Sequence, residues 1–233
     1  MDTLAVICTY NEATNIKKVI DDVLNCGLNN DIEVLVADDV SPDGTYKIVA
    51  EMAKTDKRIH LLLRTENRGR GYAGIDGFRW GLENGAKHIV ELDGDGSHNP
   101  KYIKNFRETI NGCDVVVGSR YIKGGSDTQR GFLRQTISAF ARNYLKIILS
   151  INIYDPTSGF RMFKRETVES FINKLHAPDP FIVTEMLYYT KKSKAVIKEY
   201  PIDFLERVSG QSKLNPLMLV SYLLKVLKLK IKG

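Results

Sequence analysis

Two aspartates separated by a single glycine, Asp93 and Asp95, best combine residue type and spacing for chemistry in this 233-residue sequence. They follow an apolar run, so both carboxylates come close together around a turn at its end. Mg²⁺ prefers one or two protein carboxylates together with phosphate oxygens and water, and the small Gly94 leaves space for a ligand to approach the backbone. We therefore expect a metal–phosphate site here. The plain alternative is an Asp-Gly turn.

Two further polar clusters also follow apolar runs. Asp38 and Asp39 precede the segment 41–45, whose Pro-Asp-Gly sequence indicates a turn. One aspartate could accept hydrogen bonds from a base or ribose while another caps the next helix. Glu12 lies three residues beyond Thr9, the spacing of a helix-capping pair. For both clusters, capping and turn formation remain the alternative to ligand binding.

The basic residues of interest lie in the second half of the chain. Arg207 and Lys213 are six residues apart across a glycine-containing stretch, and could hold a diphosphate as a fork and a point charge. Arg120 follows an apolar run, and Arg134 and Ser138, one helical turn apart, could present donors to a second phosphate. Solvated surface is the alternative for each of them.

A glycine- and arginine-rich stretch, residues 64–74, superficially resembles a phosphate-binding loop. It lacks the Gly-Lys-Ser/Thr ending of a P-loop, and one Gly-x-Gly is weak evidence. We interpret it as the tightly packed start of a helix.

The elements that must position these residues alternate between short apolar runs and segments of helical period. Short β-branched runs between helices predict an α/β fold with a doubly wound, mostly parallel sheet covered on both faces. The clusters above follow these runs, and open α/β sheets bind ligands at the carboxyl ends of their strands. The expected strands are Leu4–Cys8, Ile32–Ala37, Ile59–Leu63, His88–Leu92 and Val115–Gly118.

After Gly118 the pattern changes. A long helix is expected over Leu133–Ile151, a short strand within Asp155–Lys164 after a loop, and another strand near Val196–Tyr200. The last segment, Pro216–Lys232, reads as an amphipathic helix with lysines along one stripe. We therefore expect one domain over residues 1–214, to which the site residues above belong, and a basic amphipathic helix over 215–233.

Composition and charge exclude several classes of protein. With 43% hydrophobic and 27% charged residues, the chain is neither disordered nor fibrous. Three cysteines without a Cys-x-x-Cys spacing argue against a disulfide framework or a zinc site and favour a reduced cytosolic protein. We expect no signal peptide, and no run reaches the roughly 18 uncharged apolar residues of a membrane span. Residues 191–233 hold ten basic and three acidic side chains, which predicts an anionic partner at that end.

Taken together, the motifs resemble the inverting family 2 glycosyltransferases of GT-A fold. The second half resembles more specifically the dolichyl-phosphate (polyprenyl-phosphate) mannosyltransferases. That likeness runs in consistent order from about Leu4 to Leu214. The motifs that carry it are Thr9-Tyr10-Asn11-Glu12, Asp38-Asp39, Asp93-Gly94-Asp95, Gly118-Ser119-Arg120-Tyr121, Arg134 to Ser138, Asp155 to Arg161, and Arg207-x-x-Gly210-x-Ser212-Lys213-Leu214.

The resemblance implies a role for each motif residue. Asp93, Asp95 and Arg120 would be catalytic, and Asp93, Asp95 and Ser97 would bind Mg²⁺ or Mn²⁺. Arg120, Arg134 and Ser138 would hold the acceptor phosphate. The donor nucleotide would be bound by Thr9, Tyr10, Glu12, Asp39, Asp93, Gly94, Asp95, Arg207 and Lys213. The chain departs from the family at Cys8, which is commonly Pro, at Gly94, commonly Ala, at Ser97, often Gln, and in the unusually basic stretch 67–71.

The implied reaction is transfer of mannose from GDP-mannose to a polyprenyl (dolichyl) phosphate, with inversion and release of GDP. The enzyme would be cytoplasmic, at the cytoplasmic face of a membrane, held there peripherally or by a small membrane partner. A same-fold transferase using another nucleotide sugar such as UDP-glucose, or a sugar hydroxyl as acceptor, is the nearest alternative. A basic nucleic-acid-binding module is a distant one. It leaves the clustered carboxylates unexplained, so we expect no nucleic-acid partner.

Overall fold

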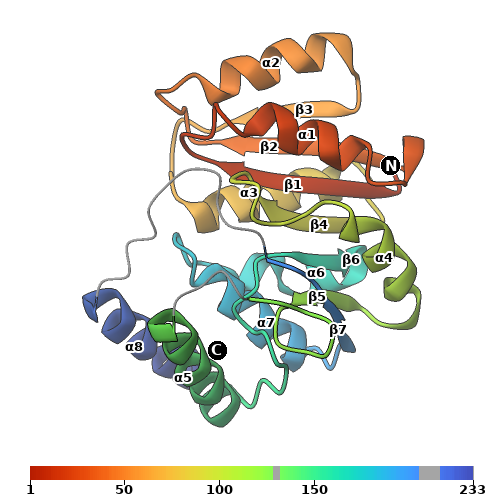
Figure 1. Ribbon diagram of the computed structural model, residues 1–233. Helices are drawn as coiled ribbons and strands as arrows, with labels where there is room; N and C mark the ends of the chain where they lie inside the picture. The colour runs from red at the N-terminus through yellow and green to blue at the C-terminus, as the bar shows by residue number, and fades with distance from the viewer. Residues whose placement is uncertain (128–131, 205–215, 233) are drawn as a thin grey trace.

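The computed structural model describes residues 1–127, 132–204 and 216–232, which are built around one seven-stranded sheet (Figure 1). From edge to edge the strand order is β3-β2-β1-β4-β6-β5-β7. All neighbouring strands are parallel except β6, which runs antiparallel to β4 and β5. The strands are β1 Thr3–Thr9, β2 Ile32–Asp38, β3 Ile59–Leu63, β4 His88–Asp93, β5 Val115–Ser119, β6 Arg161–Lys164 and β7 Ile197–Pro201.

Helices cover both faces of this sheet. The α-helices are α1 Ile16–Leu24, α2 Thr45–Thr55, α3 Arg70–Glu83, α4 Tyr102–Thr109, α5 Phe132–Leu149, α6 Arg165–Phe171, α7 Ile182–Lys192 and α8 Pro216–Lys232. Short 3₁₀ turns follow at η1 Asn29–Asp31, η2 Ile110–Gly112 and η3 Ile172–Lys174.

Two hydrophobic cores result, one on each face, and β1 contributes to both. Its Leu4 and Val6 side chains pack into the core formed with α3, α6 and α7. The intervening Ala5 and Ile7 pack into the core formed with α1, α2 and α4. Alternation of this kind follows from the two-residue period of a strand, and it explains why the strand reads as an unbroken apolar run.

The predicted doubly wound, mostly parallel sheet is confirmed. Each expected strand is present, and β1, β2, β4 and β5 extend by one or two residues beyond the expected ends. The long helix is α5, the short strand of the 155–164 region is β6, and the final helix has the predicted bounds. The expected division at residue 214 stays a prediction, because residues 205–215 lie outside the described part of the chain.

The C-terminal helix α8 packs against the body of the protein. Tyr144 of α5 donates a hydrogen bond from its hydroxyl to the Leu223 carbonyl at 3.1 Å, and Val226 is fully buried. Figure 1 shows α8 (blue) lying beside α5 (green). Within residues 1–127, 132–204 and 216–232, no helix has both the length and the apolar character needed to cross a membrane.

Candidate active site

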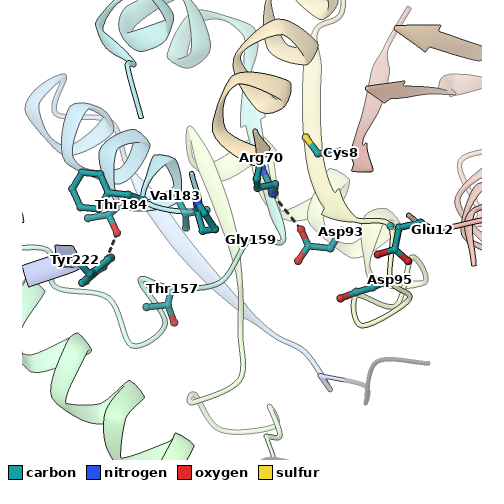
Figure 2. A pocket seen from close by; sticks show the side chains of 13 residues that line it. Cys8, Glu12, Arg70, Asp93, Asp95, Thr157, Gly159, Val183, Thr184 and Tyr222 are labelled. Atoms are coloured by element: carbon teal, nitrogen blue, oxygen red, sulfur yellow. Dashed lines mark hydrogen bonds and ion pairs between the residues drawn. The ribbon is translucent and has the colours of Figure 1, made fainter. Parts of the chain in front are cut away.

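A cavity of about 430 Å³ opens at the carboxyl end of β1 and β4. One wall holds the carboxylates of the strand ends, and the other is built from the loop before β6, the start of α7 and one residue of α8. Figure 2 shows these two walls facing each other. The lining residues are Cys8, Glu12, Arg70, Asp93, Gly94, Asp95, Thr157, Gly159, Pro180, Phe181, Val183, Thr184 and Tyr222.

The Asp93-Gly94-Asp95 turn forms the centre of the carboxylate wall. The Asp93 side chain is about one-third exposed, and its backbone N–H donates to His98 Nδ1 at 3.1 Å. Asp95 is nearly buried, and its Oδ1 accepts the Ser97 N–H at 3.0 Å. A Cβ on Gly94 would lie 2.9 Å from Thr9 Cγ2. A glycine is therefore needed here by close packing as well as by space for a ligand.

The donor set of this turn fits a hard divalent cation. Both carboxylates reach the same cavity, and one or two carboxylates are what Mg²⁺ takes when phosphate oxygens complete its shell. In the part of the chain that the structure describes, no group of three or more His, Cys, Asp and Glu side chains could hold a metal. Ser97 is fully buried behind Asp95, outside the cavity lining, and its hydroxyl has no hydrogen-bond partner among the described residues. Its predicted metal contact stays a prediction.

Arg70 is the main residue of this wall that sequence reasoning missed. Its guanidinium donates to Glu91 Oε1 at 2.7 Å and to Asp93 Oδ1 at 3.3 Å (Figure 2 draws the second contact). Burial, the largest single influence, would lower the pKa of Arg70, but the negative charges around it, those of the fully buried Glu91 and of Asp93 among them, together raise the pKa well above its usual value. Arg70 is therefore a permanent cation beside the carboxylate turn.

Close backbone packing explains how Arg70 reaches this position. The Gly71 N–H donates to the Pro178 carbonyl at 3.0 Å, and a Cβ on Gly71 would lie only 1.9 Å from the Ala177 oxygen. At Gly69, where φ is +137°, a Cβ would meet the Pro178 oxygen at 2.4 Å. The predicted helix-start packing is thus confirmed. The alternation of glycine with arginine in residues 67–71 was the only sequence signal for Arg70, and it does not reveal which way the side chain points.

Asp38 has a structural role at the end of β2. Its carboxylate is fully buried and accepts hydrogen bonds from the Thr9 hydroxyl at 2.8 Å, the Ser41 N–H at 2.8 Å and the Ser41 hydroxyl at 2.7 Å. The Asn11 N–H donates to Ser41 Oγ at 3.0 Å. These contacts tie the loop after β1 to the loop after β2, so Thr9 belongs to the framework of this corner.

Asp39 joins the end of β2 to the start of α3. It forms a buried ion pair with Arg64, and its Oδ2 accepts the Gly69 N–H at 2.7 Å. Tyr10 is more than half exposed and lies outside the cavity lining, as do Thr9 and Asp39. Of the residues expected to hold the nucleotide, the cavity brings together Glu12, Asp93, Gly94 and Asp95. The nucleotide contacts themselves stay predictions.

Arg120 lies directly after β5, as expected, but its guanidinium is buried in a two-bond ion pair with Asp155. Its Nε and Nη2 donate to the two oxygens of Asp155 at 2.7 and 2.8 Å, and Nη2 also donates to Thr157 Oγ1 at 3.1 Å. Burial would lower the pKa of Arg120, but Asp155 outweighs it and raises the pKa. Thr157 lines the cavity and Arg120 does not. The described contacts thus connect Arg120 to the cavity through Thr157.

The opposite wall is held together by Arg161, another residue that the sequence analysis did not assign. This guanidinium is fully buried and donates to the Val183 carbonyl at 2.6 Å and the Pro156 carbonyl at 2.8 Å. Burial lowers its pKa to about 10. On the same wall Thr184 of α7 and Tyr222 of α8 share a hydrogen bond of 2.7 Å (Figure 2). Arg161 and this bond fix the loop before β6, α7 and α8 to one another.

The remaining predicted residues are not brought to this cavity by the described contacts. Ser138 lies on α5 and is absent from the cavity lining. Arg134 belongs to the same helix, but its side chain lies outside the described part of the structure. Arg207 and Lys213 also lie outside the described residues, so their predicted closure over the anions is untested.

Comparison with known proteins gives the chain its family. Residues 4–171 match the model of glycosyl transferase family 2. The chain is 32% identical to a polyprenol monophosphomannose synthase of Mycolicibacterium smegmatis, over 99% of this chain and 88% of that protein. It is 35% identical to an undecaprenyl-phosphate mannosyltransferase of Micrococcus luteus, over 92% and 88%.

Solved structures agree on the fold. Glucosyl-3-phosphoglycerate synthase from Mycobacterium tuberculosis, solved with Mn²⁺, UDP and glucosyl-3-phosphoglycerate, superposes with a TM-score of 0.71 at 19% identity. The superposition covers 97% of this chain and 80% of that one. The expected GT-A fold is confirmed, and the chain belongs to glycosyl transferase family 2.

Proposed function

We propose that this enzyme transfers mannose from GDP-mannose to a polyprenyl phosphate, with inversion at the anomeric carbon and release of GDP. The observation that carries the proposal is the two-walled cavity, with Asp93 and Asp95 on one side and Thr157 and Tyr222 on the other. The relatives named above, a polyprenol monophosphomannose synthase and an undecaprenyl-phosphate mannosyltransferase, support the choice of sugar and acceptor.

The acceptor's charge simplifies the chemistry that the protein must supply. A phosphate oxygen is already anionic near neutral pH, so attack on the anomeric carbon needs no general base. The absence of a required base agrees with the surroundings of His98, the histidine beside Asp93. Its pKa is lowered by burial and its ring is stacked on Phe160, so it is placed as a packed side chain. A sugar-hydroxyl acceptor would need a base, and a steep dependence of rate on pH would favour that alternative.

The difficulty is to bring two anions together. Two unit charges about 4 Å apart repel by about 4 kcal/mol at an effective dielectric constant of about 20. In our proposal Asp93 and Asp95 hold Mg²⁺ or Mn²⁺, which would neutralise charge on the donor diphosphate when bound. Arg134 and Ser138 would bind the acceptor phosphate, and Arg207 and Lys213 would close over both anions.

Arg120 has a positioning role in this proposal. Its fork to Asp155 and its bond to Thr157 Oγ1 fix a hydroxyl at the cavity wall. The acceptor phosphate would then meet the Thr157 hydroxyl in an orientation that Arg120 holds fixed. Arg120→Lys keeps the charge but loses the fork. It should therefore raise the KM for the acceptor more than it lowers kcat. An equal change in the KM for the donor would contradict this role.

The decisive experiment is incubation with a panel of labelled nucleotide sugars and a short polyprenyl phosphate, followed by extraction into organic solvent. We expect label in the lipid phase only with GDP-mannose and a divalent cation, as a β-linked product. Asp95→Asn should abolish the transfer, whereas the control Asp22→Asn alters only an exposed pair with Lys18. Transfer from UDP-glucose in place of GDP-mannose would refute the proposed donor, and unchanged turnover of Asp95→Asn would refute the metal role.

We also propose that α5 and α8 rest on the cytoplasmic face of a membrane, where a polyprenyl phosphate would be met. An apolar stripe along α8 is exposed, formed by Val220, Leu224, Leu227 and Ile231. The neighbouring α5 exposes Phe140 and Ile147. Exposed apolar helix faces flanked by lysines are typical of helices that lie in the membrane interface.

Replacing Leu224 and Ile231 by serine should weaken binding to vesicles of phosphatidylcholine and phosphatidylglycerol, because each change removes apolar area from the interface. Transfer to a short, water-soluble acceptor should be unchanged. Undiminished vesicle binding would show that this stripe does not face the membrane.

A further inference from the structure

A second cavity of about 380 Å³ lies between α8, α7 and the segment before α7, on the far side of Phe181 from the active site. Its floor is apolar, with Phe181, Tyr189 and Leu229 among the residues that form it. Its rim carries three lysines of α8, Lys225, Lys228 and Lys232. Nothing in the proposed reaction uses this cavity.

The carboxylates near this cavity leave the rim with an excess of positive charge. Lys225 pairs with Asp179. Glu185 is nearly buried, and its Oε2 accepts the N–H groups of His176 at 2.9 Å and Ala177 at 3.0 Å, so its charge stabilises the backbone. Lys228 and Lys232 have no carboxylate partner in the part of the chain that the structure describes. Two ammonium groups that no described carboxylate pairs with therefore flank an apolar floor, which is the chemistry that recognises an anionic amphiphile.

The cavity also has a definite position relative to the exposed stripe of α8. Successive residues of a helix turn by about 100°, so Lys225, Lys228 and Lys232 form a row about a quarter turn from the stripe of Leu224, Leu227 and Ile231. Lys230 lies on the opposite flank of the same stripe. If the stripe enters a membrane interface, the lysine-rimmed cavity lies at the depth of the lipid headgroups.

We propose that this cavity binds the headgroup phosphate of an anionic membrane phospholipid. The ammonium groups of Lys228 and Lys232 bind the phosphate oxygens, and the carbon atoms next to the phosphate rest on Phe181 and Leu229. Because Phe181 lines both cavities, an anchored phospholipid holds the membrane surface one side chain away from the active site. This inference rests on the membrane contact proposed above.

Lys230 provides a matched control for the test, since it lies on the same helix within two residues of Lys228 and Lys232 but is absent from the cavity lining. Binding is measured by cosedimentation with vesicles of phosphatidylcholine and phosphatidylglycerol. Lys228→Gln and Lys232→Gln should each weaken binding about tenfold or more, as expected for a lost hydrogen bond to a charged group. Lys230→Gln should weaken vesicle binding by about fivefold at most, because it removes only the diffuse attraction of one lysine to an anionic surface. An equal loss of vesicle binding in all three variants would refute the proposal that this cavity binds a headgroup phosphate.

Competition separates a built site from diffuse attraction. Glycerol 3-phosphate should displace the wild-type protein from vesicles in a saturable manner, beyond the effect of sodium chloride at the same ionic strength, and this excess should vanish in Lys228→Gln. If both solutes act equally, no headgroup site exists. Inorganic phosphate that binds without competing with vesicles, or a nucleic acid duplex that binds more tightly than vesicles and is lost in the same variants, would also overturn the proposal.

The outcome is distinguishable from a failure of the proposed reaction. Lys228→Gln should transfer sugar to a short, water-soluble acceptor as fast as the wild type does without vesicles. If the wild type transfers no sugar but shows this lysine-dependent vesicle binding, the headgroup cavity stands and the reaction is wrong.

Discussion

Replacing Arg70 by methionine should destabilise the protein far more than its position on a cavity wall suggests. Arg70 is the cation that compensates Glu91, whose carboxylate is fully buried and whose Oε2 has no hydrogen-bond partner among the described residues. Removing one partner of a buried ion pair leaves an uncompensated charge and costs about 3–5 kcal/mol. Methionine keeps most of the length of the side chain, so little of this cost comes from a lost volume.

Glu91→Gln in the same chain should recover part of the loss. Glutamine is nearly isosteric and neutral, so the double variant no longer buries an unpaired charge, and we expect a favourable coupling of about 2 kcal/mol. Recovery stays incomplete because Glu91 is also the main charge that favours the protonated form of the buried Arg161.

Urea unfolding followed by circular dichroism measures these free energies. Arg79→Met is the matched control, since Arg79 is exposed on the same helix and faces Asp76 at 3.8 Å. It should change the free energy of unfolding by about 1 kcal/mol at most. A cost of Arg70→Met no larger than that of the control, or a double variant no more stable than Arg70→Met, would refute the reasoning.

Three further outcomes follow from the contacts described. Gly71→Ala should lower the free energy of unfolding by about 3 kcal/mol or more, measured by thermal unfolding, because its Cβ would collide with the Ala177 carbonyl oxygen, a backbone atom that cannot easily move away. A stability equal to that of the wild type would mean that α3 is not held this closely. Asp155→Asn should lower the free energy of unfolding by about 3 kcal/mol, because the buried Arg120 keeps its charge and loses its carboxylate partner. A change below about 1 kcal/mol would show that the ion pair between Arg120 and Asp155 contributes little to stability. Burial raises the pKa of Cys8 from its usual value of 9.0 to about 12, so the reactive thiolate forms only in strongly alkaline solution. Although Cys8 lines the active site, iodoacetamide should therefore modify it in the native protein only in strongly alkaline buffer. Rapid modification near neutral pH, followed by mass spectrometry of the peptide, would contradict that burial.

Some properties of this protein are local and could be predicted from the sequence. The two-residue period of β1 determines that Leu4 and Ala5 face opposite cores, and this period is complete within a few residues. The carboxylates of Asp93 and Asp95 come together because a turn joins them directly. Their position at the carboxyl end of β4 is where open α/β sheets bind ligands.

Other predictions depended on side-chain direction, which the sequence pattern does not specify. Arg120 was correctly placed after β5, yet its guanidinium turns inward because Asp155 offers two oxygens in a buried site. Of the two aspartates at the end of β2, Asp38 holds the turn and Asp39 pairs with Arg64. The sequence left these roles open, since either aspartate could cap or bind.

The opposite wall of the active site was decided by tertiary structure alone. Thr184 and Tyr222 are 38 residues apart and meet only because α8 packs back over α7. On the carboxylate wall, Arg70 likewise reaches Asp93 only because two glycines let α3 approach the 177–178 backbone closely. Sequence patterns report interactions within one turn or one strand, whereas these contacts join segments that are distant in the sequence. Their geometry exists only once both hydrophobic cores are packed.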